Sequence, residues 1–199
     1  MLKGISSILL LLSMLTSHSQ DIADLENFEK GMKPGTQLIY NVTRGKEKYN
    51  LHVTLKKAVN EMAFVWQTDT PDGKSGNITI APGALATSNA VYTNFNAGEI
   101  KLQDACALFI SKKIFNDAGT TSQASLKLNG SSDTLTVMNN TISEFNFTMD
   151  GNLMTVPGWE LQGGPGNKYT LDVFESVKFP VIFKLDIGFT MTLTEVKTK

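Results

Sequence analysis

The residues that could carry acid–base or metal chemistry are few in this chain and lie far apart in the sequence. Beyond the first nineteen residues the chain holds one histidine, His52, and one cysteine, Cys106. A zinc site needs three or four such ligands together, which this pair cannot supply. Asp69 and Asp72 are three positions apart, not at the alternating positions of a calcium loop. The sequence therefore predicts neither a metal site nor a cofactor.

Neither His52 nor Cys106 has the surroundings of a catalytic group. His52 lies between Leu51 and Val53, so in a strand its side chain points away from the face that holds these apolar residues. No Gly-x-Ser-x-Gly motif presents a serine that His52 would activate. Cys106 falls on the apolar side of a predicted helix, where burial raises the pKa of a thiol and makes it unreactive. We therefore predict that the protein is not an enzyme.

Carboxylates acting without histidine are the remaining catalytic alternative. Asp186 lies beside Lys184 on the polar side of an alternating stretch, and Asp172 and Glu175 lie just upstream. If this side lines a cavity, two of these carboxylates would form an acid–base pair, as in a hydrolase. If it faces solvent, they are an ordinary row of surface charges. A carboxylate-dependent hydrolase is thus the third hypothesis.

The aromatic residues suggest binding. In a curved sheet such side chains form the core, but a concave face lined with Phe, Met and Trp also holds an apolar ligand such as a lipid, an acyl chain or a hydrophobic peptide. Trp159 follows Pro157-Gly158 and lies near a loop. The predicted ligand-binding residues are Phe64, Trp66, Phe145, Phe147, Trp159, Phe183 and Phe189.

The first hypothesis is therefore a non-enzymatic binding protein with an apolar groove. The alternative is a structural or protein-interaction module of the cell envelope, which has no ligand cavity and presents an exposed apolar patch to an envelope partner.

The stretch Phe179–Leu193 indicates the architecture that must position these groups. Its odd positions are all large and apolar, and most of its even positions are polar, over fifteen residues. A period of two predicts extended backbone with one face on the core. We expect one long strand, with Gly188 marking a bend or bulge.

The same alternation recurs along the chain between turn signals such as Arg44-Gly45-Lys46 and Pro71-Asp72-Gly73. Helical spacing predicts a short helix over residues 21–30 and a second over residues 105–116, capped by Asp104. The fold class is mainly β, a single antiparallel curved sheet or open β-barrel of roughly ten strands with one or two helices. A two-layer sandwich is the second possibility.

The first nineteen residues have the composition of a secretory signal peptide. Lys3 is followed by the apolar run Ile8–Leu15 and by the small residues of Ser17-His18-Ser19. Cleavage after Ser19 leaves residues 20–199 as a single β-rich domain, in which no later segment is long and apolar enough for a transmembrane helix.

Charge and cysteine content restrict partners and compartment. Eighteen basic residues, one of them in the predicted signal peptide, face nineteen acidic residues, and no basic stripe is present. This balance argues against nucleic acid and against anionic membrane surfaces. A secreted protein whose single cysteine excludes an internal disulfide fits a bacterial periplasm.

Three segments carry a resemblance to known proteins: Gly31–Val42 (GMKPGTQLIYNV), Leu108–Phe115 (LFISKKIF) and Phe179–Val196. Together they resemble uncharacterised secreted proteins of Bacteroidota-type bacteria, whose curved antiparallel sheet is similar to that of the periplasmic lipoprotein carriers. The resemblance implies a periplasmic location, this fold and a binding role, and it assigns no functional residues.

Overall fold

The computed structural model describes residues 22–128, 131–137 and 142–198. The predicted signal peptide at 1–19 lies outside the described residues. The strands are β1 (Gln37–Arg44), β2 (Glu47–Val59), β3 (Glu61–Thr68), β4 (Ser75–Ile80), β5 (Ala90–Val91), β6 (Gly98–Leu102), β7 (Gln123–Leu128), β8 (Ser131–Val137), β9 (Ser143–Met149), β10 (Asn152–Gly163), β11 (Tyr169–Phe174), β12 (Ile182–Asp186) and β13 (Thr190–Lys197). The helices are an N-terminal helix over residues 22–31, α2 (Pro82–Thr87), α3 (Lys112–Thr121) and the short 3₁₀ turn η2 (Pro165–Asn167).

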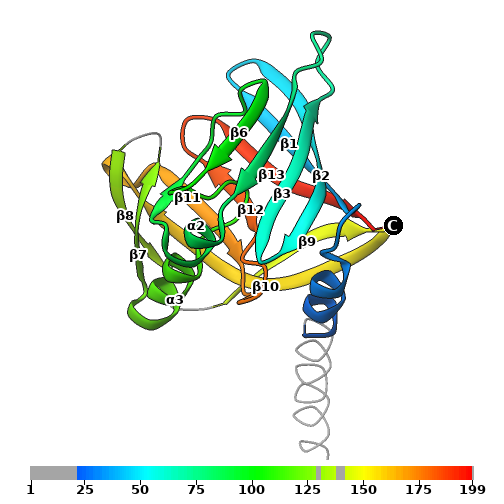
Figure 1. The fold of residues 1–199 in the computed structure, drawn as a ribbon. Helices are drawn as coiled ribbons and strands as arrows, with labels where there is room; N and C mark the ends of the chain where they lie inside the picture. The colour runs from blue at the N-terminus through cyan, green and yellow to red at the C-terminus, as the bar shows by residue number, and fades with distance from the viewer. Residues whose placement is uncertain (1–21, 129–130, 138–141, 199) are drawn as a thin grey trace, which may run out of the picture.

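All thirteen strands belong to one strongly curved sheet (Figure 1). The order is β5-β7-β8-β10-β11-β12-β13-β1-β2-β3-β4-β6, and β9 lies off this path between β10 and β13. Strands β9 to β13 thereby close into a five-stranded barrel. The predicted mainly-β fold, a curved sheet or barrel, is confirmed. The described residues form thirteen strands, where roughly ten antiparallel strands were predicted, and three of their pairings are parallel.

The barrel closes because β10 and β13 each pair with two different strands along one of their edges. Along one edge of β10, residues 152–158 pair with β9 and residues 161–163 pair with β8. Along one edge of β13, residues 190–192 pair with β12 and residues 195–196 pair in parallel with β9. The other edge of β13 pairs with β1, so this strand belongs to both the barrel and the wider sheet.

The C-terminal stretch is extended, as its alternation predicts, but it forms two strands. Strands β12 and β13 pair with Asp186 opposite Thr190. The turn between them contains Gly188 at φ 99°, a conformation that glycine adopts without steric cost. Because the turn returns the chain in register, Leu185 lies opposite Met191, and both are buried. The alternation of apolar and polar side chains therefore continues from one strand of the hairpin into the other. A period of two cannot distinguish such a hairpin from a single bent strand.

The predicted helix over residues 105–116 begins later, at Lys112. The side chain of Ser111 caps it by accepting a hydrogen bond from the backbone N–H of Ile114 at 3.2 Å. The preceding apolar residues run as an irregular buried segment, in which Cys106 exchanges backbone hydrogen bonds with Ala90 and Tyr92. A short continuous apolar run fits a buried extended segment as well as a helix, so spacing alone placed the boundary wrongly.

The N-terminal helix, predicted over 21–30, packs against the strands of the small barrel. Phe28 is fully buried, and its ring lies edge-on to Phe174 at 4.9 Å and to Phe147 at 5.8 Å. The carboxylate of Asp24 accepts a hydrogen bond from the Thr155 backbone N–H at 2.9 Å. This helix therefore completes the aromatic core of the barrel.

Replacing Phe28 with alanine should destabilise the whole domain. Loss of a fully buried ring between two others costs about 3–5 kcal/mol of unfolding free energy. Urea denaturation measures this, with Val59→Ala as the control, because Val59 is 72% exposed and its truncation should cost less than about 0.5 kcal/mol. Equal midpoints for the two variants would show that the helix is not part of the folded core.

Candidate functional site

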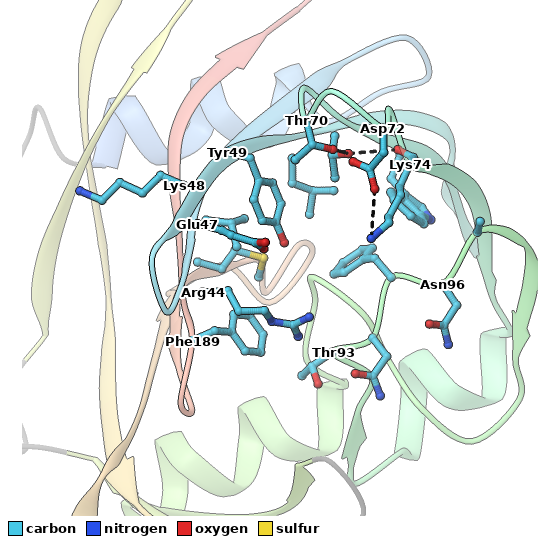
Figure 2. A pocket seen from close by; sticks show the side chains of 18 of the residues that line it. Arg44, Glu47, Lys48, Tyr49, Thr70, Asp72, Lys74, Thr93, Asn96 and Phe189 are labelled. Atoms are coloured by element: carbon cyan, nitrogen blue, oxygen red, sulfur yellow. Dashed lines mark hydrogen bonds and ion pairs between the residues drawn. The ribbon is translucent and has the colours of Figure 1, made fainter.

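A cavity of about 590 Å³ opens at one end of the curved sheet (Figure 2). It lies where the β1–β2 turn, the β3–β4 connection, the β12–β13 turn and the loop at residues 93–97 come together. We call it the end cavity. Its lining residues are Val42, Arg44, Glu47, Lys48, Tyr49, Leu51, Trp66, Thr68, Thr70, Pro71, Asp72, Lys74, Thr93, Asn94, Phe95, Asn96, Ala97, Phe189 and Met191.

The floor of the end cavity is apolar. Val42 lies opposite Met191 on one side and opposite Tyr49 on the other, so the three share the inner face of the sheet. Val42 and Met191 are buried, as is Trp66 at 1% exposure. The ring of Phe95 meets the Trp66 indole edge-on, with centroids 5.5 Å apart. Apolar side chains from four strands and one loop thus lie at the base of the cavity.

Trp66 carries a buried donor that the described residues leave unpaired. Its indole Nε1 has no hydrogen-bond partner among them. The indole lies over Gly76, where a Cβ would come within 2.8 Å of Nε1. A buried N–H without an acceptor costs about 1–3 kcal/mol. This unpaired N–H lies on the Gly76 side of the indole, and Gly76 is not among the residues that line the end cavity.

The rim of the end cavity is charged. The Arg44 guanidinium lies over the Phe189 ring, with its Cζ atom 5.1 Å from the centroid. Lys74 forms an ion pair with Asp72 at 3.3 Å, and the Thr70 hydroxyl and Lys74 both lower the pKa of that carboxyl. Figure 2 shows the Lys48 ammonium directed away from the space that the other labelled side chains surround. The rim thus joins cationic, anionic and neutral polar groups around an apolar floor.

The structure brings two of the seven predicted ligand-binding residues, Trp66 and Phe189, to the end cavity. Phe64 is buried in the core at 1% exposure. Phe145 stacks on Phe183 at 4.8 Å. The rings of Phe145 and Phe183 pack together with those of Phe147, Phe174 and Phe28 to fill the small barrel.

Sequence reasoning missed the polar half of the end cavity. Arg44 lies at a predicted turn, and the loop at residues 93–97 has no periodicity that would place it beside β1. These segments meet only because the sheet curls. Local sequence patterns predict individual strands and turns, but they do not predict the curvature of the whole sheet.

Trp159 lines a second hollow, of about 580 Å³, between the N-terminal helix, α3 and β10. Its ring lies 4.6 Å from that of Phe115, over Gly119, where a Cβ would come within 2.8 Å of the indole. Three exposed apolar residues edge this hollow: Ile22, Ile142 and Val177, at 49%, 51% and 62% exposure. We call this surface the Trp159 patch.

The three candidate carboxylates are only partly brought together. Asp172 and Asp186 project from the same face of adjacent strands, since Asp172 lies opposite Lys184, two residues before Asp186. Glu175 instead lines the Trp159 hollow. Neither the end cavity nor the Trp159 hollow includes Asp172 or Asp186.

Asp172 is a buried carboxyl in a cross-strand row. It is 6% exposed, its Oδ1 has no hydrogen-bond partner among the described residues, and it lies between Glu160 on β10 and Lys184 on β12. Burial raises the pKa of Asp172 to about 7, against the lowering effect of Lys184 and with a smaller raising effect of Glu160. The folded state therefore favours the protonated carboxylic acid.

This shift predicts a pH-dependent stability. Since the folded pKa lies above the unfolded value, the folded state binds more protons between about pH 4 and pH 7, and stability falls as pH rises through that window. Asp172→Asn should therefore raise the free energy of unfolding at pH 8 by up to about 4 kcal/mol. Urea unfolding at pH 4, 6 and 8 measures this, and parallel pH profiles for the variant and the parent would contradict it.

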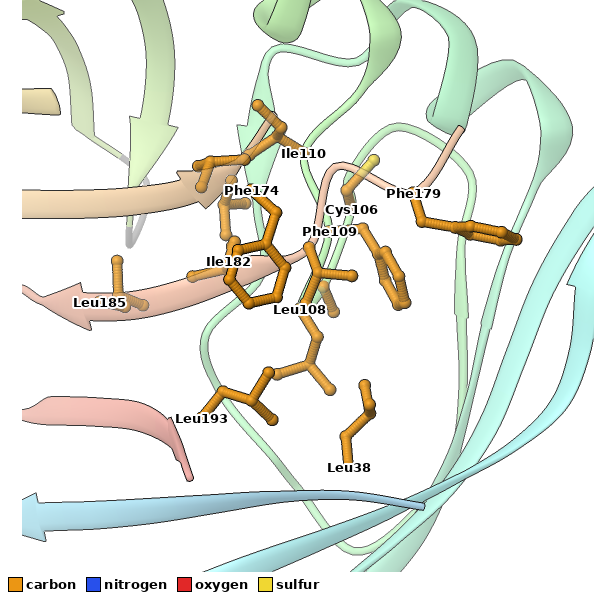
Figure 3. Packing of buried hydrophobic residues seen from close by; sticks show 14 of the residues in the cluster. Leu38, Cys106, Leu108, Phe109, Ile110, Phe174, Phe179, Ile182, Leu185 and Leu193 are labelled. Carbon is orange, nitrogen blue, oxygen red and sulfur yellow. The ribbon is translucent and has the colours of Figure 1, made fainter. Parts of the chain in front are cut away.

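Cys106 is a packing residue, as predicted (Figure 3). It is fully buried, its thiol donates to the Ala84 carbonyl at 3.3 Å, and burial raises its pKa to about 12. His52 lies on the outer face, opposite Gln67.

The Cys106 thiol should therefore resist alkylation in the folded protein. We expect iodoacetamide at pH 8 to react with the folded protein at least about a hundredfold more slowly than with protein unfolded in 8 M urea. In the folded protein the thiol is protonated and the reagent cannot reach it. Comparable rates, read by mass spectrometry, would show that the segment around Cys106 opens readily.

Comparison with known proteins gives no match: no protein-family model fits the chain, and a search of curated proteins finds no similar sequence. In the described ranges, no helix has both the length and the apolar character that crossing a bilayer requires.

Proposed function

We propose that this protein is a non-enzymatic binding protein that holds a small amphipathic molecule in the end cavity, with an acyl chain or similar apolar group on the floor. The observation that carries the proposal is a cavity of about 590 Å³ whose lining combines apolar side chains at the base with charged and polar side chains at the rim. Small-molecule sites have volumes of about 300–1,000 Å³ and pair apolar walls with a few placed polar groups.

The floor supplies affinity for an apolar chain. Each methylene group removed from water contributes about 0.8 kcal/mol. Phe95 lies in a loop without helix or strand, so its side chain can shift from Trp66 with little loss of backbone hydrogen bonding. Such a shift would open the Trp66 indole to the apolar chain of the ligand.

We further propose that the protein acts in a bacterial periplasm. The predicted signal peptide supports secretion, and the buried, unpaired Cys106 needs no oxidised partner there. An acyl chain has low solubility in such an aqueous compartment, so a protein that shields it would act as a carrier or buffer.

Filling the end cavity should weaken binding without unfolding the protein. Thr68 is half-buried on the cavity side of β3, so Thr68→Phe places a ring in the ligand's space. The matched control is Thr54→Phe, on the outer face of the adjacent β2. With Trp159→Phe as background, Trp66 is the sole tryptophan and its fluorescence follows decanoate binding.

We expect decanoate to shift the emission in the background protein and in Thr54→Phe, and at least about tenfold weaker binding in Thr68→Phe. Binding unaffected by Thr68→Phe, in a variant that still unfolds cooperatively, would place the ligand elsewhere.

The Trp159 patch favours a second candidate, the interaction module of the cell envelope. Its exposed Ile22, Ile142 and Val177 surround a hollow lined by Phe115 and Trp159, as expected of a surface that a protein partner covers. Trp66→Phe leaves Trp159 as the sole fluorophore. A partner on this patch would shift that variant's emission, whereas a ligand in the end cavity would shift that of Trp159→Phe.

A further inference from the structure

We infer that the polar end of the ligand is an anion, by chemical class a carboxylate, and that Arg44 binds it at the rim of the end cavity. This inference rests on the proposed function, because it specifies the ligand of the same cavity.

Arg44 is held in place but has no charge partner. Its guanidinium lies over the Phe189 ring with Cζ 5.1 Å from the centroid, a cation–π contact that favours this position of the guanidinium. Within the described part of the chain it makes neither an ion pair nor a hydrogen bond. Its N–H donors, arranged as a planar fork, therefore remain open to a ligand.

The other charges at the cavity leave Arg44 as the available cation. Lys74 is neutralised by Asp72 at 3.3 Å, and Lys48 is directed away from the cavity. Glu47 lies opposite Arg44 in the β1–β2 register, yet the two do not form an ion pair. The carboxylates of Glu47 and Asp72 at the rim would repel a second negative charge, which favours a singly charged anion over a phosphate dianion.

The position of Arg44 suits a head group attached to an apolar tail. Arg44 and Val42 are alternate residues of β1 and so lie on the same face, about 6–7 Å apart along the strand. Val42 begins the apolar floor with Met191, while Arg44 is at the exposed rim. A carboxylate bound by Arg44 thus directs its chain onto the floor, and the planar fork matches the two carboxylate oxygens.

The test compares three ligands that share one chain and differ only in the head group: decanoate, 1-decanol and decyltrimethylammonium. Each is titrated, below its micellar concentration, into the full-length mature protein carrying Trp159→Phe, and Trp66 emission gives the dissociation constant. Arg44→Gln removes the charge. Lys46→Gln is the matched control, since it removes one charge from the exposed turn of the same hairpin and Lys46 does not line the end cavity.

We expect decanoate to bind at least about tenfold more tightly than 1-decanol, and the ammonium compound most weakly. Arg44→Gln should abolish this preference while leaving 1-decanol binding unchanged, and Lys46→Gln should retain it. Equal binding of acid and alcohol, tighter binding of the ammonium compound, or a preference that survives Arg44→Gln would overturn the inference and leave the binding function in place. If none of the three binds, the proposed function fails, and the inference fails with it.

Discussion

The structure depends on the divided edge of β13. The first residues of this strand pair with β12 and its last residues pair in parallel with β9, while its whole length pairs with β1 on the other side. A strand with three neighbours must twist strongly, and the register shift between Ile39 and Tyr40 of β1 accommodates this. The division closes five strands into a barrel and sends the other strands into an open, curling sheet.

That closure explains why the molecule has one packed region and one hollow region. In β11, Leu171, Asp172, Val173 and Phe174 are all buried, because the barrel covers one face and the wider sheet covers the other. The barrel is filled with phenylalanine rings and leaves Asp172 with a raised pKa. Beyond β13, the curl of β1, β2 and β3 holds Val42, Leu51 and Trp66 around a space that none of the described side chains fills.

Much of this architecture could be predicted from sequence, and the missing parts share a physical cause. The alternation in Phe179–Leu193 predicts extended backbone because side-chain period is a local property. Whether Gly188 bends or reverses the chain depends on which strand Thr190 meets, and that is a long-range property. For the same reason residue type predicted Trp66 and Phe189, which line the end cavity, but did not predict Arg44, whose place over the Phe189 ring depends on strands that are distant in the sequence. Phe145 and Phe147 were predicted to bind ligand on the same grounds of residue type, but their rings are buried in the core.

The central claim is that the end cavity holds an amphipathic acid in the working protein. Native mass spectrometry of the protein, purified without detergent from its native source, tests this most directly, with organic extraction to identify whatever is released. The account predicts one ligand per chain, an acyl carboxylic acid, absent from Thr68→Phe protein prepared in parallel. A bare chain mass in the parent protein, with no acyl acid in the extract, would contradict it.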